Sequence, residues 1–178
     1  MRIARVEDAN IKIDGRVDEP IWSEIPAFDR MTVTDPDTLE KPTHKTRTRI
    51  LYTDKGLYVA GEMEQPLDTL VERLSSRDEF VNRDDFGISI DSSGEGLYGN
   101  FFNIGLGGSK QDGKIAPERN ITTQWDGPWV GETAVTDDGW SAEMFIPWSA
   151  LSMPDGGVKR EISISVLRKV AYMDETYT

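Results

Sequence analysis

The sequence predicts an all-β protein, an antiparallel β-sandwich with one or two short helical turns. Apolar and polar residues alternate along many short segments, which is the pattern of strands that bury one face. Turn residues separate these segments, among them many of the 16 Gly and 9 Pro. Helical periodicity is nearly absent. A chain of 178 residues suits one domain of two packed sheets with roughly eight to ten strands.

The strands are expected where the alternation is clearest. Residues 46–52 alternate and are followed by Asp54-Lys55-Gly56, a turn sequence typical of a hairpin. Asp137-Asp138-Gly139 indicates a second hairpin, between residues 130–135 and 140–146. Further strands are expected at residues 86–91 and 163–170. Short helical turns are expected at residues 67–74 and 148–151, each directly after a proline.

Charge and composition exclude several classes of function. The formal net charge is −12, so the surface repels phosphate and a nucleic-acid partner is not expected. No apolar stretch approaches the ~20 residues of a membrane helix, so insertion of this domain into a membrane is not expected either. The absence of cysteine excludes disulfides, thiolate metal sites and cysteine nucleophiles. The acidic surface does offer carboxylates to calcium.

Four segments, in order along the chain, resemble the signatures of family 9 carbohydrate-binding modules. The first, residues 13–22, has Asp-Gly, then Asp-Glu, then Trp. The others are residues 49–59, 84–91 and 138–147. The chain is most similar to a divergent branch found at the N-terminus of large bacterial exported proteins. In that branch, a motif over residues 98–113 and the pair Leu167-Arg168 are also expected.

This resemblance implies a jelly-roll-like sandwich over residues 1–178, at the N-terminal end of a larger exported protein. Its location would be periplasmic, in the cell envelope or extracellular, with the signal peptide outside this chain. The implied function is that of a non-catalytic, ancillary carbohydrate-binding module in carbohydrate catabolism. Its partners would be an oligo- or polysaccharide and the missing C-terminal domain. The alternative is a structural or interaction domain that has lost sugar binding and packs on that domain or on an envelope partner.

The residues that contact sugar in well-studied members of the family differ in this chain. Those members hold a sugar between two tryptophans, and the first lies just before the third signature, where this chain has Phe80 and Asn82. The acidic contact within the third signature is replaced by Gly87, and an arginine on the next strand by Phe102 or Asn103. Phe80, Asn82 and Asn103 are therefore the binding candidates that the resemblance offers.

A second group of candidates is aromatic. Sugar rings stack on flat apolar side chains and pair with nearby polar groups. Trp125 and Trp129 stand four residues apart around a Gly-Pro turn, with Asp126 beside them. The alternative is structural: Trp129 would begin a buried strand, and Trp125 would close the edge of the sandwich. The remaining tryptophans, Trp22, Trp140 and Trp148, are expected in the core.

Carboxylates suggest two places for a calcium ion, which needs several oxygen ligands. Asp14, Asp18 and Glu19 form one acidic cluster. The second surrounds Asp84 and also holds Asp78, Glu79, Asn82 and Asp85. Asp residues also stabilise turns through their own backbone, and Arg77 and Arg83 could pair with the second cluster instead. The metal candidates are therefore Asp14, Asp18, Glu19 and Asp84, with Ca²⁺ as the ion.

No enzymatic motif is present in the sequence. Adjacent Asp84 and Asp85 would point to opposite faces of a strand, whereas glycoside hydrolysis needs two carboxylates that face each other. There is no Gly-x-Ser-x-Gly and no phosphate loop. His44 is the only histidine, and we expect it in a solvated loop and not as a haem ligand. A redox or haem module is the least favoured function.

Overall fold

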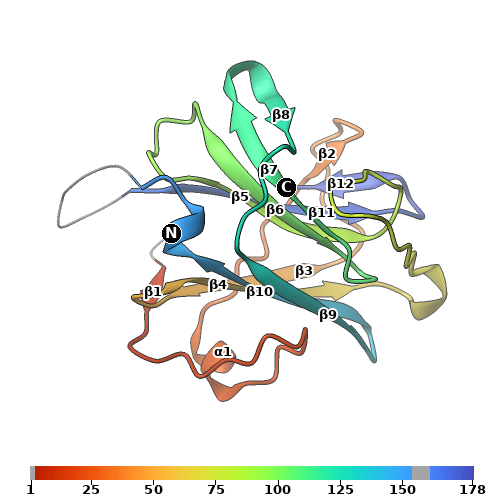
Figure 1. Cartoon of the computed structure of the whole chain (residues 1–178). Helices are drawn as coiled ribbons and strands as arrows, with labels where there is room; N and C mark the ends of the chain where they lie inside the picture. Colours follow the sequence, from red (N-terminus) through yellow and green to blue (C-terminus); the bar gives the residue numbers. More distant parts are fainter. Residues whose placement is uncertain (1–2, 154–160) are drawn as a thin grey trace.

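The computed structural model describes residues 3–153 and 161–178, which form two β-sheets packed face to face (Figure 1). The prediction of an all-β sandwich is confirmed. Twelve strands are present in these residues, more than the eight to ten expected, because four of them have only two or three residues. None of the described helices is both long and apolar enough to cross a membrane.

The five-stranded sheet has the order β1-β3-β4-β10-β9. Its strands are β1 (Ala4–Arg5), β3 (Thr46–Tyr52), β4 (Gly56–Glu64), β9 (Val130–Thr136) and β10 (Gly139–Pro147). Pairing is antiparallel except between β1 and β3. Both predicted hairpins, β3–β4 and β9–β10, lie in this sheet.

The seven-stranded sheet has the order β2-β12-β11-β5-β6-β7-β8. Its strands are β2 (Val33–Asp35), β5 (Asp85–Asp91), β6 (Gly99–Gly105), β7 (Lys110–Ala116), β8 (Asn120–Thr122), β11 (Ser163–Val170) and β12 (Glu175–Tyr177). Every pair in it is antiparallel. β2 completes the sheet by pairing with β12, from the other end of the sequence.

The core between the sheets consists of the apolar half of each alternating strand. Phe86, Ile88 and Ile90 of β5 belong to the same buried cluster as Met144 and Ile146 of β10. Burying each such side chain contributes about 1.5–3 kcal/mol to stability. The opposite residues of β5, β6 and β7 form the outer face of the seven-stranded sheet, the face turned away from the five-stranded sheet.

A buried polar network joins the two sheets at one end. The Arg168 guanidinium of β11 donates to the carbonyls of Lys45 (3.0 Å) and Glu64 (2.8 Å) and to the Gln65 amide oxygen (3.1 Å). Gln65 in turn donates to Asp84 (2.9 Å). Burial lowers the pKa of Arg168 to about 10, and the side chain remains charged at neutral pH. The side-chain amide of Gln65 therefore links the guanidinium of Arg168 to the carboxylate of Asp84.

Residues 6–25, here called the N-terminal strap, cover the outer side of the five-stranded sheet. The strap includes the short helix α1 (Pro20–Glu24), which Pro20 begins at its first turn. Trp22 and Ile25 of the strap pack with Leu51 and Ala60 of the sheet in a second apolar cluster. Figure 1 shows this segment as a layer below the sheet.

Three 3₁₀ turns complete the structure: Leu67–Thr69, Pro117–Arg119 and Trp148–Ala150. The first and third lie where helical turns were expected, although the first is shorter than residues 67–74. Residues 70–74 are not helical but enter a long loop, which carries several of the candidate residues.

Candidate functional site

Asp84 closes the base of a loop made of residues 71–84, here called the 71–84 loop. Its carboxylate accepts hydrogen bonds from the backbone N–H groups of Val71 (2.8 Å) and Ala171 (2.8 Å) and from Gln65 Nε2 (2.9 Å). The Asp84 N–H also donates to the Val71 carbonyl (3.1 Å). Asp84 has no exposed surface. Both carboxylate oxygens are thus used to hold the loop ends together, although the residue was a metal candidate.

The middle of the 71–84 loop lies along β7. The Asp78 N–H donates to the Lys110 carbonyl (3.1 Å), and Gln111 Nε2 donates to the Glu79 carbonyl (2.9 Å). Ser75 N–H donates to Ser109 Oγ (2.9 Å). The Lys110 carbonyl belongs to the part of the β7 edge that β8 does not pair, since β8 pairs only with residues 114–116, while the other two bonds involve side chains. The loop is therefore well ordered by hydrogen bonds along its length.

Phe80 projects from this loop and is 65% exposed. The carbonyl of the preceding residue, Glu79, accepts a hydrogen bond from the Gln111 side chain. In the sheet, Gln111 lies opposite Asn103, and Asn103 lies opposite Gly87. Gln111, Asn103 and Gly87 form one row across the outer face, because their neighbours along the strands face the core. The structure thus brings Phe80 next to this row, and Asn82 is exposed nearby on the same loop.

Gly87 determines how the Asn103 side chain lies. A Cβ at position 87 would stand 1.8 Å from Asn103 Oδ1, so only glycine leaves room for the amide. Asn103 is half-buried and lies over β5. Its amide can both donate and accept a hydrogen bond, as a sugar hydroxyl requires.

A buried ion pair flanks this row. Arg83 Nε donates to Asp85 Oδ1 (2.8 Å), and Arg83 Nη1 donates to Ser75 Oγ (2.5 Å). Gly105 makes space for the guanidinium, because a Cβ there would lie 2.3 Å from Arg83 Nε. Burial raises the pKa of Asp85, although the hydrogen bond from Arg83 lowers it. Arg83 was expected to pair with the second acidic cluster, and it does pair with Asp85. The sequence feature that allows the guanidinium to lie there is Gly105 in β6.

The tryptophan candidates lie elsewhere, on the crossover segment, residues 123–129, which leads from β8 to β9. Trp129 is 4% exposed and belongs to the core, with its ring edge-on to Phe102 at 5.7 Å. Trp125 is half-buried and packs against the same cluster. Trp129 therefore offers no open ring face to a ligand, and Trp125 closes the edge of the sandwich. Asp126 is exposed.

Three carboxylates meet between the 71–84 loop, β7 and the crossover segment. Oxygens of Asp78, Asp112 and Asp126 lie within 4.8 Å of one another, and such a group can hold a metal ion such as Ca²⁺. Arg77 already pairs with Asp112 (2.5 Å) and Asp126 (3.1 Å). Among residues 3–153 and 161–178, this is the one group of three potential ligands so placed. Asp112 was not among the predicted metal ligands, although it lies in the motif of residues 98–113.

The first predicted metal cluster belongs to the N-terminal strap. Asp14 pairs with Lys12 (3.1 Å), and the hydrogen bonds and charge of this pair lower the pKa of Asp14. Glu19 Oε1 accepts a hydrogen bond from the Lys12 N–H (3.0 Å), and Asp18 is exposed. Asp84 lies in another part of the fold, at the base of the 71–84 loop, so the four candidates do not form one site.

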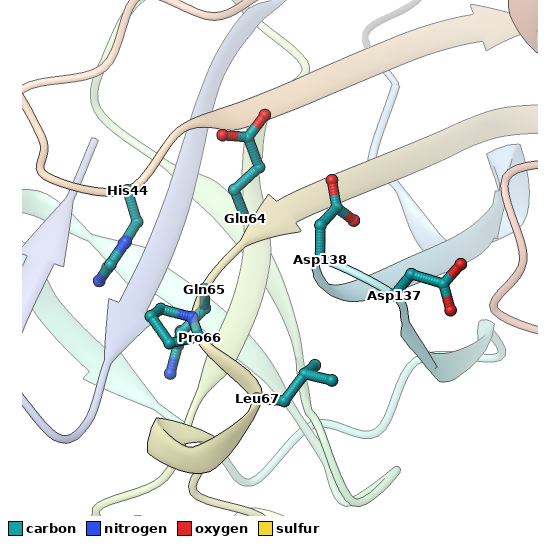
Figure 2. A pocket seen from close by; sticks show the side chains of 7 residues that line it. All are labelled: His44, Glu64, Gln65, Pro66, Leu67, Asp137 and Asp138. Carbon is teal, nitrogen blue, oxygen red and sulfur yellow. The ribbon is translucent and has the colours of Figure 1, made fainter.

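A shallow hollow of about 480 Å³ lies beside His44; Figure 2 shows the side chains that line it. Glu64, Asp137 and Asp138 also line it. His44 is half-buried, with Nε2 2.6 Å from the Tyr172 hydroxyl, and was expected to be solvated. Burial and the charge of Arg168 lower the pKa of His44. Phe, Tyr and Trp are absent from the side chains that line this hollow, although Tyr172, which contacts His44, is 44% exposed.

Solved structures share this architecture over nearly the whole chain. A family 9 carbohydrate-binding module from Caldicellulosiruptor kristjanssonii in complex with cellotriose has a TM-score of 0.67 at 13% identity, covering 99% of this chain and 82% of that one. The chain has the fold of a family 9 carbohydrate-binding module. A family 9 structure from the same organism with glucose gives 0.61 at 15% identity, over 99% and 83% of the two chains.

A candidate carbohydrate-binding protein from Bacteroides uniformis gives the highest of these scores, 0.73 at 13% identity, covering 98% of this chain and 86% of that one. No family model and no curated protein matches the sequence. The family 9 likeness is therefore one of fold, with a strongly diverged sequence, as the four ordered signatures indicated.

Proposed function

We propose that this domain is a non-catalytic carbohydrate-binding module that holds its sugar on the outer face of the seven-stranded sheet, beside Phe80. The observation that carries the proposal is an exposed aromatic ring on an ordered loop, next to the polar row of Gly87, Asn103 and Gln111. An exposed phenyl ring loses contact with water when a ligand covers it, which favours binding.

The chemistry of this surface suits a neutral sugar. The Phe80 ring can stack on the apolar C–H face of a pyranose, while the Asn103 amide can pair with its hydroxyl groups. Asn82, exposed on the same loop, offers a second amide. Because structures of the same fold contain cellotriose and glucose, glucose and β-linked glucose oligosaccharides are the first ligands to test.

Catalysis is not part of the proposal, because the adjacent carboxylates are engaged within the protein. Asp84 uses both oxygens for backbone and Gln65 donors, and Asp85 pairs with Arg83. We propose that the module serves a larger exported protein of carbohydrate catabolism, whose other domains would act on the bound polysaccharide. The resemblance of the four sequence signatures supports this role.

Calorimetric titration with glucose and cellotriose tests the proposal. Phe80→Ala should weaken binding about tenfold, which corresponds to about 1.4 kcal/mol, a typical contribution of one stacked aromatic ring. Asn103→Ala should weaken it by a similar factor through lost hydrogen bonds. Tyr98→Ala is the matched control, since Tyr98 is another exposed aromatic residue but lies outside the site. Absence of binding to either sugar, or full affinity in Phe80→Ala, would contradict the assignment.

A second candidate function, that of an interaction domain, is favoured by strand β9. It is an edge strand of seven residues, and its Val130 and Val135 are 47% and 57% exposed. Unpaired strand edges with apolar side chains accept further strands. Slower amide exchange of β9 in the full-length natural protein than in this domain would support packing on a neighbouring domain, whereas equal exchange would argue against it.

A further inference from the structure

Arg77 links the 71–84 loop to two other parts of the fold. Its Nη2 lies 2.5 Å from Asp112 Oδ1 on β7, and its Nε lies 3.1 Å from Asp126 Oδ1 on the crossover segment. Nη2 also donates to the carbonyl of Gly127 (3.3 Å). Asp112 has no exposed surface, whereas Asp126 is largely exposed. One guanidinium thus connects three segments that are far apart in sequence.

Asp78, the next residue, extends this connection through the backbone. The Asp112 N–H donates to Asp78 Oδ1 (2.9 Å), and the Asp78 N–H donates to the Lys110 carbonyl (3.1 Å). Asp78 thus binds the free edge of β7 once through its own N–H and once through its carboxylate. Because Phe80 follows two residues later, its position depends on these contacts.

Arg77 brings a positive charge to a group of three carboxylates. Asp78, Asp112 and Asp126 would repel one another if no cation stood among them. Lys110 and Lys114 lie on the same face of β7 as Asp112, and they stand over the rings of the two crossover tryptophans at 5.6 and 5.9 Å. Arg77 is the basic side chain that pairs directly with two of the three carboxylates, Asp112 and Asp126.

Both oxygens of Asp112 are already engaged. Oδ1 accepts from Arg77, and Oδ2 accepts from the Gly127 N–H at 2.5 Å. A calcium ion takes six to eight oxygen ligands, so it would have to displace these partners and recruit more oxygens than the three carboxylates supply. A guanidinium, in contrast, matches a carboxylate with parallel donors.

We propose that Arg77 is the built-in cation that holds the 71–84 loop in its ligand-binding conformation, so that sugar binding by this chain needs no calcium. The inference rests on the proposed function, because it concerns the loop that carries Phe80. Arg77 acts through the loop and does not touch the sugar, which makes it a positioning residue.

Residue-level hydrogen exchange of the domain tests the ordering itself, without a sugar. Wild-type exchange at the amides of Asp78, Asp112 and Gly127 should be the same in EDTA and in millimolar calcium. Arg77→Met should speed exchange there about tenfold or more, as expected for the loss of a charge-assisted hydrogen bond. Arg73→Met is the matched control on the same loop, since Arg73 is exposed, and it should exchange like wild type. Faster wild-type exchange in EDTA, or no change in Arg77→Met, would overturn the proposal.

If Arg77→Met does not fold, as judged by circular dichroism, Asp126→Asn replaces it. This change removes one partner of Arg77 at an exposed position and should also speed exchange at Asp78 and Gly127, whereas unchanged exchange would count against the proposal.

Calorimetry with cellotriose provides the second readout. Arg77→Met should bind more weakly than wild type, while Arg73→Met should not, and EDTA should leave the wild-type affinity unchanged. Calcium-dependent binding by wild type would overturn the inference but leave the proposed function intact. Absence of sugar binding by wild type would refute the proposed function, whereas the exchange experiment would still decide the role of Arg77 in the loop.

Discussion

Glu143 makes the stability of the domain sensitive to pH near neutrality. It lies on β10 with no exposed surface, under the N-terminal strap. Its carboxylate accepts hydrogen bonds from the Trp22 indole (2.9 Å) and from the backbone N–H groups of Asp14 (3.2 Å) and Gly15 (3.1 Å). Burial, the largest cause, and the nearby charge of Glu19 raise the pKa of Glu143 to about 7, against the effect of the three donors.

The raised pKa fixes the sign of the effect. The folded protein holds the Glu143 proton up to about pH 7, while the unfolded chain releases it near the ordinary value of 4.5. The protonated Glu143 therefore stabilises the folded state. This stabilisation is complete below about pH 4.5 and is lost as the pH rises through about 7. At about 1.4 kcal/mol per pH unit, the free energy of unfolding should fall by about 3 kcal/mol across this range.

Urea denaturation of wild type and Glu143→Gln at several pH values measures this effect. The glutamine does not titrate, so the difference between the two free energies of unfolding should change by about 3 kcal/mol between about pH 5 and about pH 8. Taking the difference removes the contribution of His44, whose lowered pKa gives a slope of opposite sign.

Glu132→Gln is the matched control, because Glu132 lies directly opposite Glu143 on β9 but is exposed. It should keep most of the wild-type pH dependence. If Glu143→Gln shows the same slope as wild type, Glu143 does not hold a proton in the folded state, and the reasoning from burial is refuted.

Three further substitutions have defined outcomes. Gly15→Ala should cost about 3 kcal/mol in urea denaturation, because φ is +84° and a Cβ would stand 2.3 Å from the Thr133 backbone; a loss below about 1 kcal/mol would contradict this. Asp84→Asn should also cost about 3 kcal/mol, since the amide keeps one acceptor oxygen but turns its NH2 group toward one or two of the three donors, and a stable variant would show that these bonds matter little. Gly87→Ala should displace Asn103 and weaken sugar binding about tenfold by calorimetry, whereas unchanged affinity would place the sugar elsewhere.

The strands of the fold were predictable where one face alternates. The predicted ranges 46–52 and 163–170 coincide with β3 and β11, because every second residue of these strands is turned into the sandwich. A strand was expected at residues 2–6, where β1 lies, but the short strands β2, β8 and β12 were missed, as was β7, whose sequence is mostly polar. Two or three residues carry no measurable periodicity, and such strands form only because longer neighbours offer them an edge.

The candidate site was predictable in part. Phe80 and Asn103 were named from the resemblance. The register of β6 and β7 places Asn103 opposite Gln111, and Gln111 bonds to the carbonyl of Glu79, the residue before Phe80. The role of Arg77 was not predictable, since its partners Asp112 and Asp126 are distant in sequence and belong to other segments. A tertiary ion pair leaves no local pattern, whereas a strand does.

The first signature of the sequence, Asp-Gly followed by Trp, now has a physical explanation. Asp14, Gly15 and Trp22 supply the three donors that meet Glu143, a residue of the fourth signature. Two signatures that lie more than 100 residues apart in sequence thus describe one buried contact.

The pairing of β2 with β12 has a consequence for how the domain folds. It joins Asp35 to Thr176, and Thr32 and Thr178 exchange two backbone hydrogen bonds beside it. Bringing two segments so distant in sequence together costs chain entropy before the contacts between them can stabilise the fold. Proteins rich in such distant pairings therefore fold slowly. During synthesis, β2 cannot pair in the seven-stranded sheet until β12 leaves the ribosome. Until then the nascent chain exposes the unpaired edges of β2 and β5, the partners of β12 and β11, and exposed strand edges favour aggregation.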